Sequence, residues 1–154
     1  MKSKIMKWIL LSAMIVALGA FTGGLAAGDA EWNILKTLQI EATPIDVAIT
    51  PDGKRAFVSH GGNNTVTAID LDKLRKLLEE STDEQLDLYA NHLGISSSYV
   101  IGRISTGSNP KGMVISPDGS KLYVAERLDD RIAVINTQTL ETELRLDLEG
   151  PKRL

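Results

Sequence analysis

The sequence predicts an all-β protein built from a repeated unit of four short antiparallel strands. Three observations support this fold class. The segment 50–58 (TPDGKRAFV) returns as segment 116–124 (SPDGSKLYV), so residue n of the first copy corresponds to residue n + 66 of the second. Apolar and polar side chains alternate around both copies, as in half-buried strands. Each copy also places Pro-Asp-Gly between two such runs, a tripeptide that favours a tight turn.

The two turns carry the most specific structural prediction in the chain. Proline presets φ at the first corner of a turn, the aspartate side chain bonds nearby backbone, and glycine accepts a positive φ. Because the turns match in the two units, we interpret both aspartates as turn residues and not as a catalytic pair. The predicted structural turn residues are Pro51, Asp52, Gly53, Pro117, Asp118 and Gly119.

Further strands are expected around these turns, in the order of the chain. A leading strand is expected at 32–40. The strands of the first unit are expected at 45–50, 55–59, 65–71 and 99–104, and those of the second unit at 112–116, 121–126, 131–136 and 141–148.

A helical hairpin, expected at about 72–94, interrupts the first unit between its third and fourth strands. Leu74 and Leu78 lie on one face of the first helix at helical spacing. Thr82 and Gln85 form a capping-box pattern that begins the second helix. We expect the hairpin to pack on itself or on the edge of the unit. Because it departs from the repeat, it is also a candidate for partner contact.

The N-terminal segment 1–27 has the organisation of a secretory signal peptide. Three lysines precede an apolar run at 8–21, and small residues follow it. The run is short for a spanning helix, which needs about 20 apolar residues. Cleavage near Ala26 or Ala27 is the first interpretation and a retained membrane anchor is the alternative. The expected location is periplasmic or secreted.

Four short antiparallel strands, joined by tight turns and repeated, are typical of a β-propeller blade. Segments 110–126 and 131–137, with their counterpart at 43–71, resemble the YVTN family of propeller repeats. The tetrads Phe57-Val58-Ser59-His60 and Tyr123-Val124-Ala125-Glu126 stand where the family has its name-giving residues, without the usual Thr-Asn ending.

The resemblance implies a partial β-propeller at 28–150. It would hold one blade at 43–105 with the helical insert, a second blade at 109–148, the leading strand, and a tail at 151–154. The chain also resembles the N-terminal propeller part of exported proteins that continue into a dihaem cytochrome-c-peroxidase-like domain. That domain is absent here, so its activity is not carried over.

Composition excludes several function classes. The formal net charge is −3, and loss of the leader lysines makes the remaining chain more acidic, which argues against nucleic-acid partners. The absence of cysteine excludes disulfides, a thiol nucleophile and covalent c-type haem. His60 and His92 stand apart and are interpreted as solvated or capping residues. The sequence predicts no catalytic, cofactor-binding or metal-binding residue, and no cofactor.

We therefore expect an exported, non-catalytic binding or scaffold module that is not an enzyme. The alternative is the propeller part of a haem-containing, peroxidase-like periplasmic oxidoreductase whose catalytic domain is missing. A ring needs about four to eight blades. The chain is thus a fragment of a longer protein, one of several copies that self-associate to complete the ring, or a freestanding pair of blades. The expected partner is an unknown protein or small-molecule ligand, with no nucleic acid and no membrane after signal cleavage.

Overall fold

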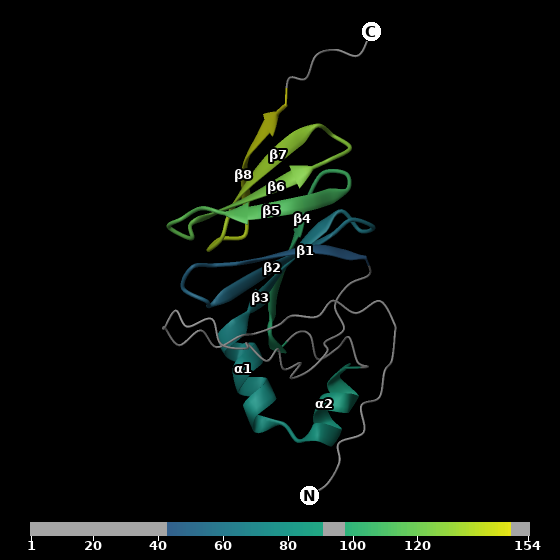
Figure 1. Ribbon diagram of the computed structural model, residues 1–154, viewed down its shortest axis with the longest axis vertical. Coiled ribbons are helices and arrows are strands. Elements are labelled where there is room, and N and C mark those ends of the chain that lie inside the picture. The colour runs from purple at the N-terminus through teal and green to yellow at the C-terminus, as the bar shows by residue number, and fades with distance from the viewer. Residues whose placement is uncertain (1–42, 91–97, 149–154) are drawn as a thin grey trace, which may run out of the picture.

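Two stacked β-sheets and a pair of short helices form the described part of the chain (Figure 1). The computed structural model describes residues 43–90 and 98–148. The predicted signal peptide, leading strand and C-terminal tail lie outside these residues. In the described ranges, no helix combines the length and the apolar character that crossing a membrane requires.

Each sheet is an antiparallel meander of four strands that follow one another in the chain. The predicted fold class, an all-β partial propeller with a helical insert, is confirmed. The first sheet contains β1 (Pro44–Ile49), β2 (Arg55–His60), β3 (Thr65–Asp70) and β4 (Val100–Ser105), and the second contains β5 (Pro110–Ile115), β6 (Lys121–Glu126), β7 (Arg131–Asn136) and β8 (Thr142–Asp147).

The repeat extends to the irregular points of the backbone. The register shifts after Pro44 in the first sheet and after Pro110 in the second. A second shift follows Ala68 and, equivalently, Val134. Most positive φ angles of the described residues also recur in pairs, at Thr43 and Asn109, Asn64 and Asp130, and Gly53 and Gly119, whereas that of Leu140 has no counterpart. Both sheets therefore follow one backbone plan.

An apolar core lies between the two sheets. Alternation along each strand sends every second side chain into this space, and the burial of Leu122, Val124 and Glu126 on β6 follows that period. The sheets come closest along β1 and β5, as blades do near the axis of a ring. The buried core residues are Phe57, Val66, Ala68, Ile104, Leu122, Val124, Ala133 and Ile135.

The insert forms helices α1 (Leu71–Glu80) and α2 (Asp83–Ala90), which extend away from the first sheet (Figure 1). Asp70 caps α1 by accepting a hydrogen bond from the backbone N–H of Lys73 at 3.0 Å. The predicted capping box is present, with Gln85 N 3.3 Å from Thr82 Oγ1 and Thr82 N 2.9 Å from Gln85 Oε1.

A second apolar cluster joins α1 to the first sheet. Leu71 and Leu74 are buried in it together with Tyr99. The sheet contributes Ala56, Val58 and Ile69, which point away from the second sheet. The first turn of α1 thus packs on the outer face of the first sheet. Burial in this cluster also raises the pKa of the Tyr99 hydroxyl.

Candidate functional site

The predicted turn residues lie at the same hairpin corner of the two sheets. Thr50 Oγ1 donates to Asp52 Oδ1 at 2.6 Å, and Ser116 Oγ donates to Asp118 Oδ1 at 2.5 Å. Gly53 and Gly119 adopt φ angles of 68° and 76°, which favour glycine. The structure gives both aspartates local turn partners.

Hydrogen bonds within the turns stabilise the charged form of both aspartates. The Ser116 hydroxyl and then the backbone N–H of Ser120 lower the pKa of Asp118 to about 2. The Thr50 hydroxyl and the backbone N–H of Lys54 likewise lower the pKa of Asp52. A carboxylate whose pKa lies well below neutral pH accepts a proton only weakly, so the turn aspartates are poorly matched to general acid–base catalysis.

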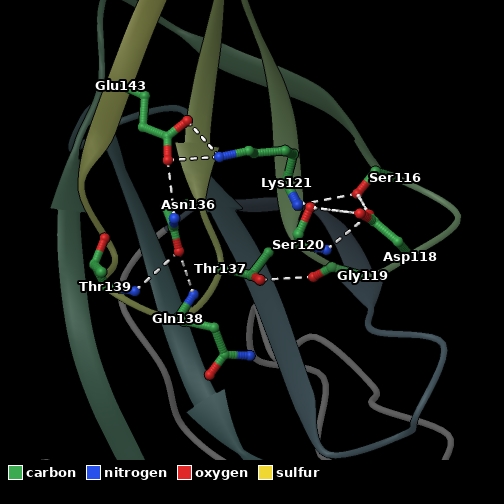
Figure 2. Close-up of polar contacts among 10 residues, drawn as sticks. All are labelled: Ser116, Asp118, Gly119, Ser120, Lys121, Asn136, Thr137, Gln138, Thr139 and Glu143. Carbon is green, nitrogen blue, oxygen red and sulfur yellow. Dashed lines mark hydrogen bonds and ion pairs between the residues drawn. The ribbon is translucent and has the colours of Figure 1, made fainter.

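A second polar group lies beside the second turn (Figure 2). Lys121 Nζ forms an ion pair with Glu143, and Asn136 Nδ2 donates to Glu143 Oε1 at 2.8 Å. The Lys121 hydrogen bond, followed by that of Asn136, lowers the pKa of Glu143. Thr137 Oγ1 donates to Gly119 O at 2.6 Å. These groups bond to one another and fasten the β7–β8 connection to the turn.

Polar contacts also join the two sheets, and the sequence analysis missed them. Asp46 Oδ2 accepts from the backbone N–H of Met113 at 2.7 Å. Ser59 Oγ donates to Lys111 O at 2.9 Å. These contacts meet the backbone where the register shift at the start of β5 interrupts the ladder. We call Asp46 and Ser59 the polar latch between the sheets.

Glu126 is a buried carboxylate at the end of β6, with no exposed surface. Its Oε1 accepts from the backbone N–H of Gly107 at 2.7 Å and from Arg145 Nε at 3.2 Å. Close by, Asp129 Oδ2 accepts from Ser108 N at 2.8 Å, and this backbone bond is the main cause that lowers the pKa of Asp129. Both carboxylates therefore anchor the connection between the sheets. No pattern in the sequence indicates this role, because Gly107 and Glu126 meet only after folding.

The outer face of the second sheet, defined as the face turned away from the first sheet, exposes aliphatic side chains. Val114 on β5 is 61% exposed, and Leu144 and Leu146 on β8 are 52% and 45% exposed. Tyr123 and Ile132 of the middle strands lie on this face and are half-buried. Contiguous exposed apolar surface of this kind marks interaction sites.

The two histidines were expected to be solvated or capping residues, and for His60 the expectation of solvation is wrong. His60 ends β2 with its side chain fully buried, and its Nε2 lies 3.0 Å from Thr67 Oγ1. It lies on the same strand face as Val58, so the strand period buries it. His92 lies outside the described residues. Within residues 43–90 and 98–148, no three His, Cys, Asp or Glu side chains gather where they could hold a metal ion.

Comparison with known proteins relates the chain to an enzyme subunit. Over 97 residues the chain is 34% identical to hydrazine synthase subunit beta of Kuenenia stuttgartiensis, a match that covers 63% of this chain and 25% of that protein. The solved Kuenenia stuttgartiensis hydrazine synthase matches with a TM-score of 0.62 and 30% identity, over 69% of this chain and 32% of that chain. The chain thus spans about a quarter of its curated relative. No family model matches it.

More distant structures support the fold alone. The dihydro-heme d1 dehydrogenase NirN, in complex with DHE, matches with a TM-score of 0.51 and 15% identity, over 75% of this chain and 20% of that chain. Apo AztD from Citrobacter koseri gives a TM-score of 0.51 and 13% identity, over 75% and 26%. Both neighbours have propeller-like folds.

From the sequence we expected a chain that is not an enzyme. That expectation is wrong, because it placed the chain outside enzyme families. The finding that overturns it is the relationship to hydrazine synthase subunit beta. The sequence carries no recognisable catalytic motif, but the repeats of a propeller fold consist of packing and turn residues that neither indicate nor exclude an enzyme family. The haem-peroxidase alternative gains no better support from these comparisons.

Proposed function

We propose that the chain supplies two neighbouring blades of a larger β-propeller in a subunit of a hydrazine-synthase-like enzyme complex. The observation that carries this proposal is the 34% identity over 97 residues with hydrazine synthase subunit beta. The two units, at 43–105 and 109–148, would be blades with YVTN-type repeats. Because a ring needs about four to eight blades, the remaining ones would come from other polypeptide segments.

The surface of the described residues supports a role in binding protein. The polar groups at the turns and between the sheets bond to each other, as Asp118 does with Ser116 and Glu126 with Gly107. The aliphatic outer face of the second sheet, in contrast, is exposed. Apolar surface with interdigitating side chains is what one blade offers to the next, so the chain would act by assembly with neighbouring blades and subunits.

Isolation from the native organism tests this proposal. The full chain would carry an affinity tag at its C-terminus and be purified under non-denaturing conditions, and mass spectrometry would identify the proteins in its complex. We expect stoichiometric co-purification with polypeptides related to the rest of hydrazine synthase. Recovery of the chain alone, or in a complex free of such polypeptides, would overturn the proposal.

We also propose that the chain is exported, on the basis of the lysine leader, apolar run and small residues at 1–27. N-terminal sequencing of the protein from its own organism tests this proposal. A start near residue 28 is expected after cleavage. A mature protein that keeps Met1 and fractionates with the cytoplasm would refute export.

A further inference from the structure

We infer that the free edge of β8 pairs antiparallel with β8 of a second copy of this chain, about a two-fold axis at Leu146. β8 is the last strand of the second sheet, in the order β5-β6-β7-β8. The contact joins two sheets edge to edge and leaves the faces of each sheet open. It goes beyond the proposed function and does not depend on which complex contains the chain.

The place of β8 in the sheet pair makes its edge accessible. The two sheets come closest along β1 and β5, so the outermost strand β8 lies far from that contact. In Figure 1, β8 lies at the end of the molecule opposite the helices α1 and α2. Every residue from Glu143 to Asp147 is exposed. Blades of a ring pack face to face, so the edge of β8 would stay free in a complete propeller.

The backbone of β8 presents alternate residues to this edge. Leu148 N donates to Asp130 O at 2.8 Å, so the backbone of Leu148 faces β7. The direction alternates along a strand, and the backbone groups of Arg145 and Asp147 therefore point away from β7. Each of these two residues offers an N–H donor and a C=O acceptor to a further strand. A second strand can bond to them without disturbing the bonds between β7 and β8.

The charges of β8 restrict the register of this pairing. A two-fold axis at Leu146 places Arg145 of each copy opposite Asp147 of the other, and opposite charges at facing positions stabilise a strand pair. An axis at Arg145 would bring two arginines face to face and would set Glu143 opposite Asp147. Like charges at facing positions are destabilising, so this second register is disfavoured.

The ion pairs already present would continue across the contact. Arg131 Nε lies 2.6 Å from Asp147 Oδ1, and Arg145 Nε lies 3.2 Å from Glu126 Oε1. The side chains of Asp147 and Arg145 remain 73% and 40% exposed, so both can meet a second copy. Pairing about Leu146 would join the two ion pairs into one row of alternating charges that crosses from copy to copy.

The aliphatic side chains favour the axis at Leu146 over an axis at Leu144. With the axis at Leu146, this leucine faces itself and Leu144 faces Leu148, and the three side chains are 45%, 52% and 53% exposed. An axis at Leu144 would also bring opposite charges face to face, but it would set Leu146 opposite Thr142. The axis at Leu146 therefore forms the longer row of leucine contacts across the edge.

The equivalent strand of the first sheet lacks these features. β4 keeps an arginine at Arg103, but Ser105 stands in the place of Asp147. Gly102 likewise stands in the place of Leu144. Two β4 strands paired in the same way would have neither the facing opposite charges nor the row of leucines. The proposed pairing is therefore a property of β8 and not of the repeat.

Single cysteines test the register, because the chain has no cysteine of its own. Leu146→Cys would face itself at a non-hydrogen-bonded position, where the two Cα atoms are about 4.5 Å apart and a disulfide can form. Leu144→Cys is the matched control on the same side of the strand, and its two copies would lie about 13 Å apart. Under mild oxidation of the full chain, we expect Leu146→Cys to form a disulfide-linked dimer and Leu144→Cys to form none. No dimer from Leu146→Cys, or equal or greater cross-linking of Leu144→Cys, would overturn the inference.

Substitutions at Asp147 test the hydrogen bonds of the edge. Asp147→Pro removes an edge N–H but no bond to β7, because proline is tolerated where the N–H of an edge strand faces solvent. Asp147→Ala is the matched control, since it also loses the ion pair with Arg131 but keeps the N–H. In sedimentation velocity over a dilution series, we expect the unsubstituted chain to dimerise, the alanine variant to dimerise more weakly and the proline variant to stay monomeric. A monomeric unsubstituted chain, or a proline variant that dimerises as the alanine variant does, would overturn the inference.

The cysteine experiment decides the question if the proline variant does not fold, which circular dichroism would show. Neither experiment uses other polypeptides of the proposed complex. Isolation of the chain without hydrazine-synthase-related polypeptides would therefore refute the proposed function and leave the pairing of β8 to be judged by these outcomes.

Discussion

Leu122→Ala removes buried aliphatic atoms from the core between the sheets, where the leucine has no exposed surface. The lost transfer free energy is about 0.8 kcal/mol per methylene, or about 2.4 kcal/mol for this substitution. The cavity left in a packed interface increases the total to about 3–5 kcal/mol. We expect the free energy of unfolding to fall by this amount.

The matched control is Leu144→Ala, which makes the same chemical change on the opposite face of the same sheet. Leu144 is 52% exposed, so about half of the transfer term is lost, about 1 kcal/mol. Solvent fills the vacated space, and no cavity term is expected. The two variants should therefore differ by at least about 2 kcal/mol.

Urea denaturation of the full chain, followed by circular dichroism, measures both values. The midpoint should shift while the slope with denaturant stays constant, because the exposed area of unfolding changes little. Equal destabilisation by both substitutions in the isolated chain would refute the reasoning, since it would mean that the outer face of the second sheet is covered. A Leu122→Ala effect below about 1 kcal/mol would show that the sheets do not pack on each other.

Three further predictions concern the turns and the buried carboxylate. NMR titration should give Asp118 a pKa of about 2, and Ser116→Ala should raise this pKa. Because the pKa of Asp118 in the folded chain lies below the ordinary 3.8, its ionised form stabilises the folded state fully above pH 3.8. This contribution to the free energy of unfolding is lost as the pH falls through about 2. Gly119→Ala should lower the free energy of unfolding by about 1–2 kcal/mol, since it forces a side chain into positive φ, whereas Gly112→Ala has open space for its Cβ and should change it little in a denaturant titration. Glu126→Ala should cost about 3 kcal/mol in the same assay, through the unbonded Gly107 N–H and the cavity, and an effect below about 1 kcal/mol would contradict the buried anchor.

The sequence predicted the architecture well because the governing signals are local. Alternation along each strand and the Pro-Asp-Gly turns act within a few residues, and the repeat shows them twice. The Thr82–Gln85 capping box was also visible, since its two bonds span three positions. These features need no knowledge of distant parts of the chain.

The exposure of the outer face of the second sheet and the buried anchors could not be predicted in the same way. Alternation shows that Leu144 and Leu146 share a face, but not whether another sheet covers that face. Glu126 meets Gly107 through the connection between the sheets, a contact that no sequence spacing reveals. His60 looked like a turn residue because glycines and asparagines follow it. In the structure His60 is the last residue of β2, and its position on the strand places its side chain on a buried face.

The insert also lengthens the connection that must close before the first sheet is complete. The last strand of the first sheet joins β3 after a connection from residue 71 to residue 99, whereas β8 joins β7 after residues 137 to 141. The longer connection has about six times as many residues as the shorter, and for a flexible chain this difference costs about 1.5 kcal/mol more closure entropy. Pulsed hydrogen exchange during refolding would report this difference as later protection of β4 than of β8. The second sheet would then form first and provide an apolar surface. The first sheet would add β4 on this surface later, because the helical insert lengthens its connection.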